Sequence, residues 1–188
     1  MKRQHSIALT ALLYSGAALA HPGHAEGALA GLLHPLTGLD HVLAMLAVGL
    51  WGAQLGGRAQ WLLPAGFVAC LAAGGALGMA GYSVPLVEAG IVTSVLLLGM
   101  LIGFAVRLPV GAALAVVGVF ALFHGFAHGS EMPAHDNGWL YAAGFVAASA
   151  MLHIAGLWLG RSASAHGRWL RGSGAAISLA GVWLAIAG

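Results

Sequence analysis

The sequence predicts an all-α, polytopic membrane protein with six transmembrane helices, formed after an N-terminal signal peptide is removed. Of its 188 residues, 60% are hydrophobic and only 6% are charged, whereas a soluble domain carries about 25% charged residues. Polar or helix-breaking interruptions divide the apolar sequence into stretches close to the roughly 20 residues that a bilayer-crossing helix needs. A chain so poor in charge cannot cover a water-facing surface, so lipid is its expected solvent.

The first 20 residues have the pattern of a secretory signal peptide. Lys2 and Arg3 form its basic start, residues 7–14 its apolar core, and residues 18–20, Ala-Leu-Ala, a small-x-small cleavage site. The alternative is an uncleaved first transmembrane helix, but the apolar stretch is short for a span. We therefore expect residues 21–188 to form a single mature domain that begins outside the membrane with His21 and His24.

Six apolar spans are expected at residues 30–54, 61–80, 84–106, 110–128, 138–160 and 170–187. With an outside N-terminus, the loops after the first, third and fifth spans face the cytoplasm. These loops contain every arginine of the mature chain, which are Arg58, Arg107, Arg161, Arg168 and Arg171. Because the outward loops contain no Lys or Arg, the arrangement obeys the positive-inside rule. The prediction is a multi-pass protein of the bacterial inner membrane with a periplasmic mature N-terminus.

Several classes of function are disfavoured. The small excess of basic over acidic residues does not indicate nucleic acid as a partner. Lys2 and Arg3 precede the cleavage site, and the remaining arginines are scattered between spans. The single cysteine, Cys70, lies in an apolar run and has no partner for an intrachain disulfide. The sequence contains no Gly-x4-Gly-Lys-Ser/Thr phosphate loop, so we do not expect it to hydrolyse ATP.

Ionisable side chains are concentrated in the first span, in the run His34-Pro35-Leu36-Thr37-Gly38-Leu39-Asp40-His41. Charged or ionisable groups within a membrane are costly and indicate function by default. On a regular helix, His34 and His41 would lie on nearly the same face but about 10 Å apart along the axis. Pro35 and Gly38 favour a kinked or unwound turn, which could bring the two histidines and Asp40 toward one point.

A second concentration ends the fourth span, in the run Phe123-His124-Gly125-Phe126-Ala127-His128-Gly129-Ser130-Glu131. His124 and His128 are four residues apart, so both imidazoles project from one helix face. Glu131 continues that face if the helix persists beyond Gly129. Imidazole and carboxylate suit borderline divalent ions such as Ni(II), Co(II) or Zn(II). We predict metal ligation by His34, Asp40, His41, His124, His128 and Glu131, and initial capture by His21 and His24.

Two further residues are secondary candidates. His153 stands alone among apolar neighbours in the fifth span, where a histidine is most often a hydrogen-bond partner for another helix; the alternative is a relay toward the cytoplasm. Glu88, near the outer end of the third span, is either a carboxylate of the site or an interfacial charge.

At these residues the sequence resembles the HupE/UreJ family of nickel permeases. The family pattern His-x5-Asp-His matches His34 through Asp40-His41, and Phe-His-Gly-x-Ala-His-Gly-x-Glu matches residues 123–131 without departure. The resemblance implies nickel uptake that supplies hydrogenase or urease maturation, with cobalt as a second substrate. The larger nickel/cobalt transporters are distantly similar, with one residue fewer between His and Asp-His.

The predicted function is secondary transport of a divalent transition metal, nickel(II) first, by a protein that is not an enzyme. No permanent cofactor is expected, and the expected partners are the nickel ion, the lipid bilayer and, as a further option, other copies of the chain. One alternative is an intramembrane metal-dependent hydrolase, although Gly125 stands where zincins place their glutamate. The other is a metal sensor or accessory protein without transport.

Overall fold

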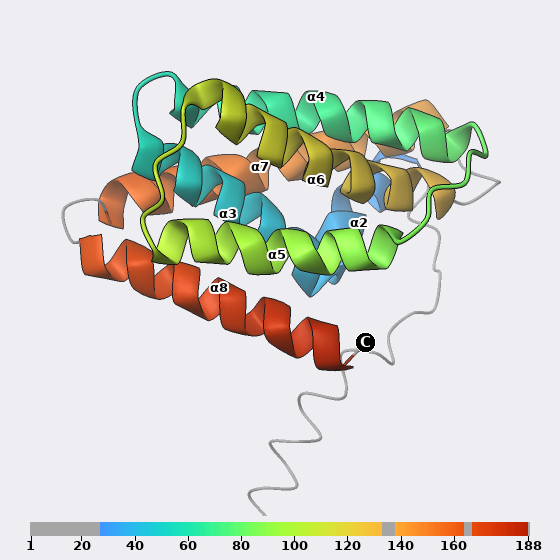
Figure 1. Ribbon diagram of the computed structural model, residues 1–188. Coiled ribbons are helices and arrows are strands. Elements are labelled where there is room, and N and C mark those ends of the chain that lie inside the picture. Colours follow the sequence, from blue (N-terminus) through green and yellow to red (C-terminus); the bar gives the residue numbers. More distant parts are fainter. Residues whose placement is uncertain (1–26, 133–137, 164–166, 188) are drawn as a thin grey trace, which may run out of the picture.

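The computed structural model describes residues 27–132, 138–163 and 167–187, and these residues are helical with short connections (Figure 1). The signal peptide predicted at residues 1–20, and with it His21 and His24, lies outside the described residues. The helices are α2 (Ala28–Thr37), α3 (Leu39–Leu55), α4 (Ala59–Met79), α5 (Val87–Gly103), α6 (Val110–Ser130), α7 (Gly138–Ala163) and α8 (Gly167–Ala187). The expected all-α, multi-pass membrane architecture is thus confirmed.

The number of spans is less simple than the sequence predicted. Helices α4, α6, α7 and α8 are each long and apolar enough to cross a membrane. The pair α2 and α3 passes the same test only as one span, and it is bent by 87°. Helix α5 is apolar but only 17 residues long. Length and composition therefore give four or five spans in the described residues, and the count of six remains a prediction.

Helix α5 is shorter than the expected span at 84–106 because the backbone turns sharply at both of its ends. Leu86 and Ala105 have φ angles of 59° and 54°, in the left-handed region that ends a right-handed helix. Side chains of other helices bind the carbonyl groups released at its C-terminal end. Trp51 Nε1 donates to the Val106 carbonyl over 3.1 Å, and Arg171 Nε donates to that of Gly103 over 3.0 Å.

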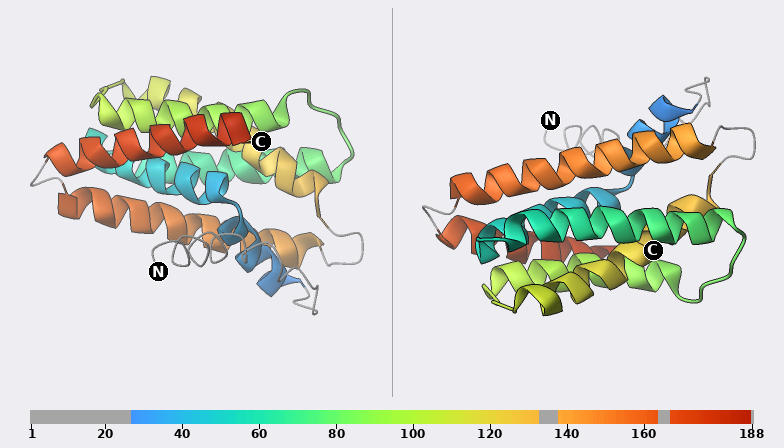
Figure 2. Two further views of the ribbon diagram at one scale, coloured as in Figure 1. Left: turned by 90° about the horizontal axis from the view of Figure 1, so that it is seen from below. Right: turned by 90° about the horizontal axis from the view of Figure 1, so that it is seen from above.

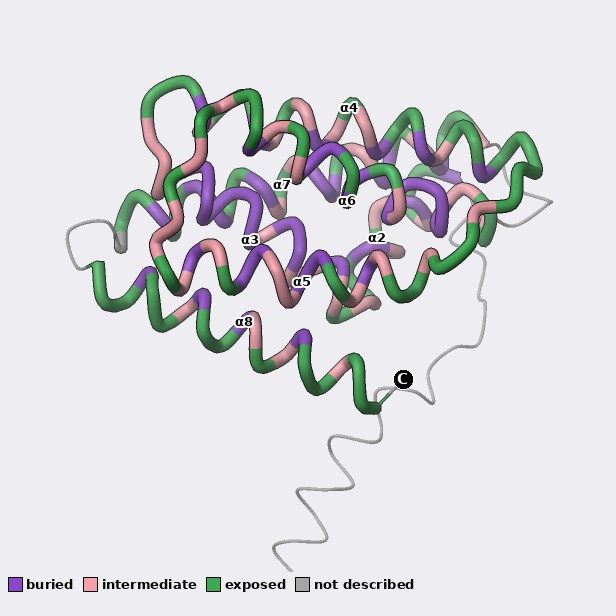
Figure 3. The backbone as a smooth tube through the Cα atoms, in the orientation of Figure 1, coloured by how far each residue is buried: buried purple, intermediate pink, exposed green. Residues whose placement is uncertain are grey.

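Helix α3 lies at the centre of the bundle and contacts α4, α5, α7 and α8. Its residues from Ala44 to Trp51 are almost all buried, and Figure 3 shows burial concentrated on this helix and on the inner faces of its neighbours. Figure 2 shows α7 running beside both α2 and α3, and both of these helices contact α7. The core therefore encloses the helix that carries Asp40 and His41 in its first turn.

The outer surface of the bundle is apolar, as expected for a protein dissolved in lipid. Five of the six tryptophans are exposed, near the ends or outward faces of helices α4, α7 and α8. These are Trp61, Trp139, Trp158, Trp169 and Trp183. Tryptophan is enriched where a membrane protein meets the lipid–water boundary.

Glycine residues of both helices allow α4 and α6 to approach within backbone contact. A Cβ atom added to Gly74 or Gly78 would overlap the backbone of α6, and one added to Gly125 or Gly129 would overlap the backbone of α4. Such small-residue pairs are typical of helix interfaces in membranes. Helix α4 thus fills the space beside Gly125 and Gly129, the glycines next to His124 and His128.

All described arginines lie at one end of the bundle. Figure 1 shows that the α3–α4 and α5–α6 connections, the end of α7 and the start of α8 share this end. Arg58 is the N-cap of α4, and Arg107 lies in the α5–α6 connection. The C-terminal end of α6, with His128 and Glu131, lies at the opposite end (Figure 1).

Candidate metal site

A cavity of about 280 Å³ lies where the α2–α3 break meets the C-terminal part of α6 and the start of α5. Its polar lining includes the only three carboxylates in the described part of the chain, Asp40, Glu88 and Glu131. His34, His41 and His128 line the same cavity. Because all described acidic groups converge here and the arginines lie at the other end, the cavity is suited to a cation.

The break between α2 and α3 carries half of these groups into the cavity. Helix α2 ends at Thr37, Gly38 takes an extended backbone (φ −95°, ψ 117°), and α3 restarts at Leu39. Pro35 lacks a backbone N–H and so weakens the last turn of α2. The chain changes direction at Gly38, directly after this turn. His34 therefore approaches the cavity from α2, and the pair Asp40–His41 approaches it from the first turn of α3.

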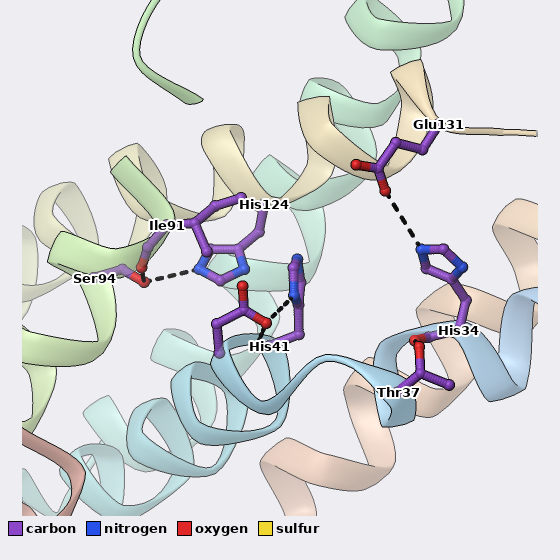
Figure 4. A network of polar contacts seen from close by, with 8 residues as sticks. His34, Thr37, His41, Ile91, Ser94, His124 and Glu131 are labelled. Carbon is purple, nitrogen blue, oxygen red and sulfur yellow. Dashed lines mark hydrogen bonds and ion pairs between the residues drawn. The ribbon is translucent and has the colours of Figure 1, made fainter. Parts of the chain in front are cut away.

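Asp40 and His41 form a closely bonded pair. Asp40 Oδ1 accepts hydrogen bonds from the His41 backbone amide over 2.8 Å and from His41 Nδ1 over 2.7 Å (Figure 4). This bond leaves His41 Nε2 to act as the ring's acceptor or metal ligand, because a neutral imidazole carries one proton. Gly38 makes room for the pair, since a Cβ there would lie 2.7 Å from Asp40 Oδ1 and 2.8 Å from His41 Nδ1.

Helix α6 supplies the remaining groups. His124 and His128 are buried on the same face, one helical turn apart, and face the start of α3. Glu131 is the C-cap of α6, so the helix does carry it round toward His34. Glu131 Oε2 lies 3.7 Å from His34 Nε2 (Figure 4).

The imidazoles form a continuous row. Ring centroids are 4.7 Å apart for His34 and His128, 4.1 Å for His128 and His41, and 4.7 Å for His41 and His124. The two ends of the row differ in exposure: the side chains of Glu131 and His34 are 57% and 33% exposed, whereas His128 and His41 are buried at 5% and 8% exposed and His124 is fully buried. The row therefore leads from the open mouth of the cavity into the core.

At the mouth, one ligand atom each from His34, His128 and Glu131 lies within 4.8 Å of the others. Three ligands bonded to one ion at about 2.1 Å in tetrahedral geometry lie about 3.4 Å from one another. The three groups would therefore need to approach one another by up to roughly 1.4 Å to share one ion.

Deeper in the row, several imidazole nitrogens are buried without a hydrogen-bond partner among the described residues. They are His41 Nε2, His124 Nδ1 and both ring nitrogens of His128. A buried polar atom that lacks a partner destabilises a protein by about 1–3 kcal/mol. Nitrogens left in this state along one row are suited to transient bonds with a metal ion or water.

The two secondary candidates occupy different places. Glu88 is exposed and lines the cavity with the predicted ligands. His153 lies outside the cavity, is 1% exposed, and donates from Nδ1 to the Ser149 carbonyl over 2.5 Å. The Phe67 ring contacts both His153 and the innermost histidine of the row, His124. Its centroid lies 4.9 Å from that of His153 and 6.0 Å from that of His124.

Sequence reasoning overlooked two polar residues at the site. Thr37 lines the cavity, and its hydroxyl donates to the His34 carbonyl over 2.7 Å. Ser94 of α5 contacts His124 Nε2 over 2.8 Å (Figure 4). Thr37 lies inside the first motif and could have been included, whereas a serine in an apolar span carries no signal of its own.

The fold and the cavity together define a multi-pass α-helical membrane protein with a row of histidines and carboxylates inside its bundle. A family model described as HupE / UreJ protein matches residues 9–184. The chain belongs to this family. It is 47% identical over 181 residues to a protein named Protein HupE from Rhizobium leguminosarum bv. viciae, covering 95% of each chain. No solved structure matches the chain.

Proposed function

We propose that this member of the HupE/UreJ family is a secondary permease for a divalent transition metal, with nickel(II) as its main substrate and cobalt(II) as a second one. Uptake would cross the bacterial inner membrane and supply the maturation of hydrogenase or urease. The single observation that carries the proposal is the row of imidazoles that begins at Glu131 and His34 and ends at buried His124.

The chemistry of the donors supports a transition metal over a hard cation. Imidazole is a good ligand for nickel, copper and zinc, whereas Mg²⁺ and Ca²⁺ prefer oxygen ligands alone. Here four imidazoles stand beside carboxylates along one path. Ligands spread along a path allow an ion to bind weakly at successive points and then leave, as conduction requires.

The proposed sequence of steps follows the order of the groups along the row, from its exposed end to its buried end. Glu131, His34 and His128 receive the ion at the mouth, after capture by His21 and His24 of the mature N-terminus. His41 and then His124 bind it deeper in the bundle. Asp40 acts by holding His41 in place and by balancing the positive charge of the ion.

The positions of the arginines support the direction of transport. Cytoplasmic loops are enriched in arginine, so the end with Arg58 and Arg107 would face the cytoplasm, and the cavity would open toward the periplasm. A membrane potential that is negative inside favours entry of a divalent ion by roughly 4.6 kcal/mol per 100 mV. This driving force is adequate without ATP hydrolysis.

Uptake of radioactive nickel by cells tests the proposal. His124→Ala and Asp40→Ala should abolish uptake at low nickel concentration while the protein remains in the membrane. Val117→Ala is the matched control for His124→Ala, because Val117 is fully buried on the same helix and has no donor atom. Wild-type uptake by both His124→Ala and Asp40→Ala would refute the proposal.

Experiments on the purified protein distinguish the alternatives. Purified protein that binds nickel but does not move it into vesicles would favour a sensor or accessory role. Turnover of a peptide or lipid substrate by metal-loaded protein, again without ion movement, would favour the hydrolase.

A further inference from the structure

Ser94 is a fully buried serine on α5, in a helix that is otherwise almost entirely apolar. Its Oγ atom makes two short polar contacts. One joins it to the Ile91 carbonyl oxygen over 2.6 Å, and the other joins it to His124 Nε2 over 2.8 Å. Figure 4 shows Ser94 on one side of the His124 ring and His41 on the other.

The chemistry of the three groups fixes the direction of both hydrogen bonds. A carbonyl oxygen has no proton and can only accept, and a serine hydroxyl has one proton to donate. At 2.6 Å the Ser94 hydroxyl must therefore donate to Ile91. Ser94 Oγ is then left to accept, so His124 Nε2 carries the proton of the imidazole.

The opposite nitrogen of His124 is consequently unprotonated. Neutral imidazole holds one proton, so a proton at Nε2 leaves a lone pair at Nδ1. His124 Nδ1 is buried and has no hydrogen-bond partner within residues 27–132, 138–163 and 167–187. The ring it belongs to packs against His41 with centroids 4.7 Å apart.

Within the described structure His41, like His124, has one bonded and one unpartnered ring nitrogen, but the roles of Nδ1 and Nε2 are reversed. Its Nδ1 is bonded to Asp40, and its Nε2 is the buried nitrogen without a partner. In metal sites a ligating histidine almost always donates its other ring N–H to a carboxylate, carbonyl or similar acceptor, which sets the tautomer and orients the ring. Asp40 supplies such an acceptor to His41, and Ser94 supplies one to His124.

We propose that Ser94 is a positioning residue, which holds His124 in the Nε2-protonated tautomer and presents Nδ1 to the transported metal. The inference deepens the proposed function and rests on it for the identity of the ligand. Ser94 itself does not touch the ion. The hydroxyl group at this position, rather than its volume, is what the site requires.

The tautomer can be measured on metal-free protein by nitrogen NMR of ¹⁵N-histidine-labelled samples, with the His124 signals assigned by their loss in His124→Ala. Wild-type protein should show a protonated Nε2 and an unprotonated Nδ1 at His124. Ser94→Ala should give a mixture of tautomers, and Ser94→Thr, which keeps the hydroxyl, should restore the wild-type pattern. A wild-type His124 protonated at Nδ1 would overturn the inference whatever the transport result.

Nickel titration of the purified protein and nickel uptake provide the functional readout. Ser94→Ala should raise the half-saturating nickel concentration by about tenfold or more, the usual effect of removing such a partner. Ser149→Ala is the matched control, because Ser149 is equally buried and its hydroxyl also donates to a carbonyl of its own helix. Within the residues that the structure describes, the only bond between Ser149 and a histidine is the one from His153 to the Ser149 backbone carbonyl, which the substitution keeps. It should bind and transport nickel like the wild type.

The outcomes separate the two proposals. If wild-type protein neither binds nor transports nickel, the proposed function fails, while the NMR comparison still decides whether Ser94 sets the tautomer. If wild-type protein transports nickel but Ser94→Ala shows the wild-type tautomer and affinity, the inference is wrong. An equal loss in Ser94→Ala and Ser149→Ala would also overturn it, since that result indicates a general effect on packing.

Discussion

Replacement of Gly38 by alanine places a single methyl group against the Asp40–His41 pair. The backbone angles of Gly38 are open to any residue, so the change introduces no conformational strain. The added Cβ would lie 2.7 Å from Asp40 Oδ1 and 2.8 Å from His41 Nδ1, where ordinary contacts begin near 3.4 Å. Both side chains would have to move by about 0.6 Å or more, since van der Waals repulsion rises steeply below contact.

Such a displacement breaks or weakens the bond of 2.7 Å that orients His41. A hydrogen bond to a charged group contributes about 1.5–3 kcal/mol. If that energy holds His41 in its metal-binding position, its loss corresponds to a roughly 10- to 150-fold increase in the half-saturating nickel concentration. Protein abundance should change little, because the backbone angles of Gly38 suit alanine and the overlap involves two side chains and no backbone atom.

The assay is nickel uptake at a series of concentrations, normalised to the amount of protein in the membrane. Gly111→Ala serves as the control, since nothing lies within 4 Å of a Cβ at that helical position. A Gly38→Ala protein with wild-type half-saturation would refute the reasoning.

Four other substitutions test three separate parts of the structure. Gly129→Val should reduce stability by about 1–3 kcal/mol, measured by thermal unfolding in detergent, because a Cβ there collides with the α4 backbone; Gly111→Val should be tolerated. Glu131→Gln and Glu88→Gln should each raise half-saturation by less than about fivefold, as expected for exposed charges, and an unchanged uptake curve for both would count against a role for the cavity mouth. Trp51→Phe should lower the unfolding midpoint, because it removes a hydrogen bond of about 0.5–1.5 kcal/mol to the end of α5; no shift would show that this bond contributes nothing measurable.

The sequence allowed the helices to be located well where apolar spans end in clear interruptions. The span expected at 110–128 became α6, Val110–Ser130, and the one at 138–160 became α7, Gly138–Ala163. It did not fix the form of the first span, because Pro35 and Gly38 indicate a break without giving its angle. The ends of α5 were also missed, since nothing in the sequence shows that Leu86 and Ala105 adopt left-handed angles.

The site could be predicted only where it depends on local spacing along one helix. The spacing of His124 and His128 places both on one face of any helix, so their common orientation follows from the sequence alone. The meeting of that face with His41 depends on how α3 packs in the bundle, which local patterns do not determine. Ser94 lies 30 residues from His124 and became visible only through their contact.

The break at Gly38 divides the row's imidazole groups into two sets that differ in how freely their spacing can change. On α6 the rise between His124 and His128 is held near 6 Å by an unbroken helix. His34 belongs to α2 and His41 belongs to α3, and these two helices are joined at Gly38. Rotation about the φ and ψ angles of Gly38 therefore changes the distance between the two imidazoles. One side of the cavity therefore keeps a constant spacing while the other can adjust, and the proposed function would need such an adjustable side for the residues to close around an ion and release it.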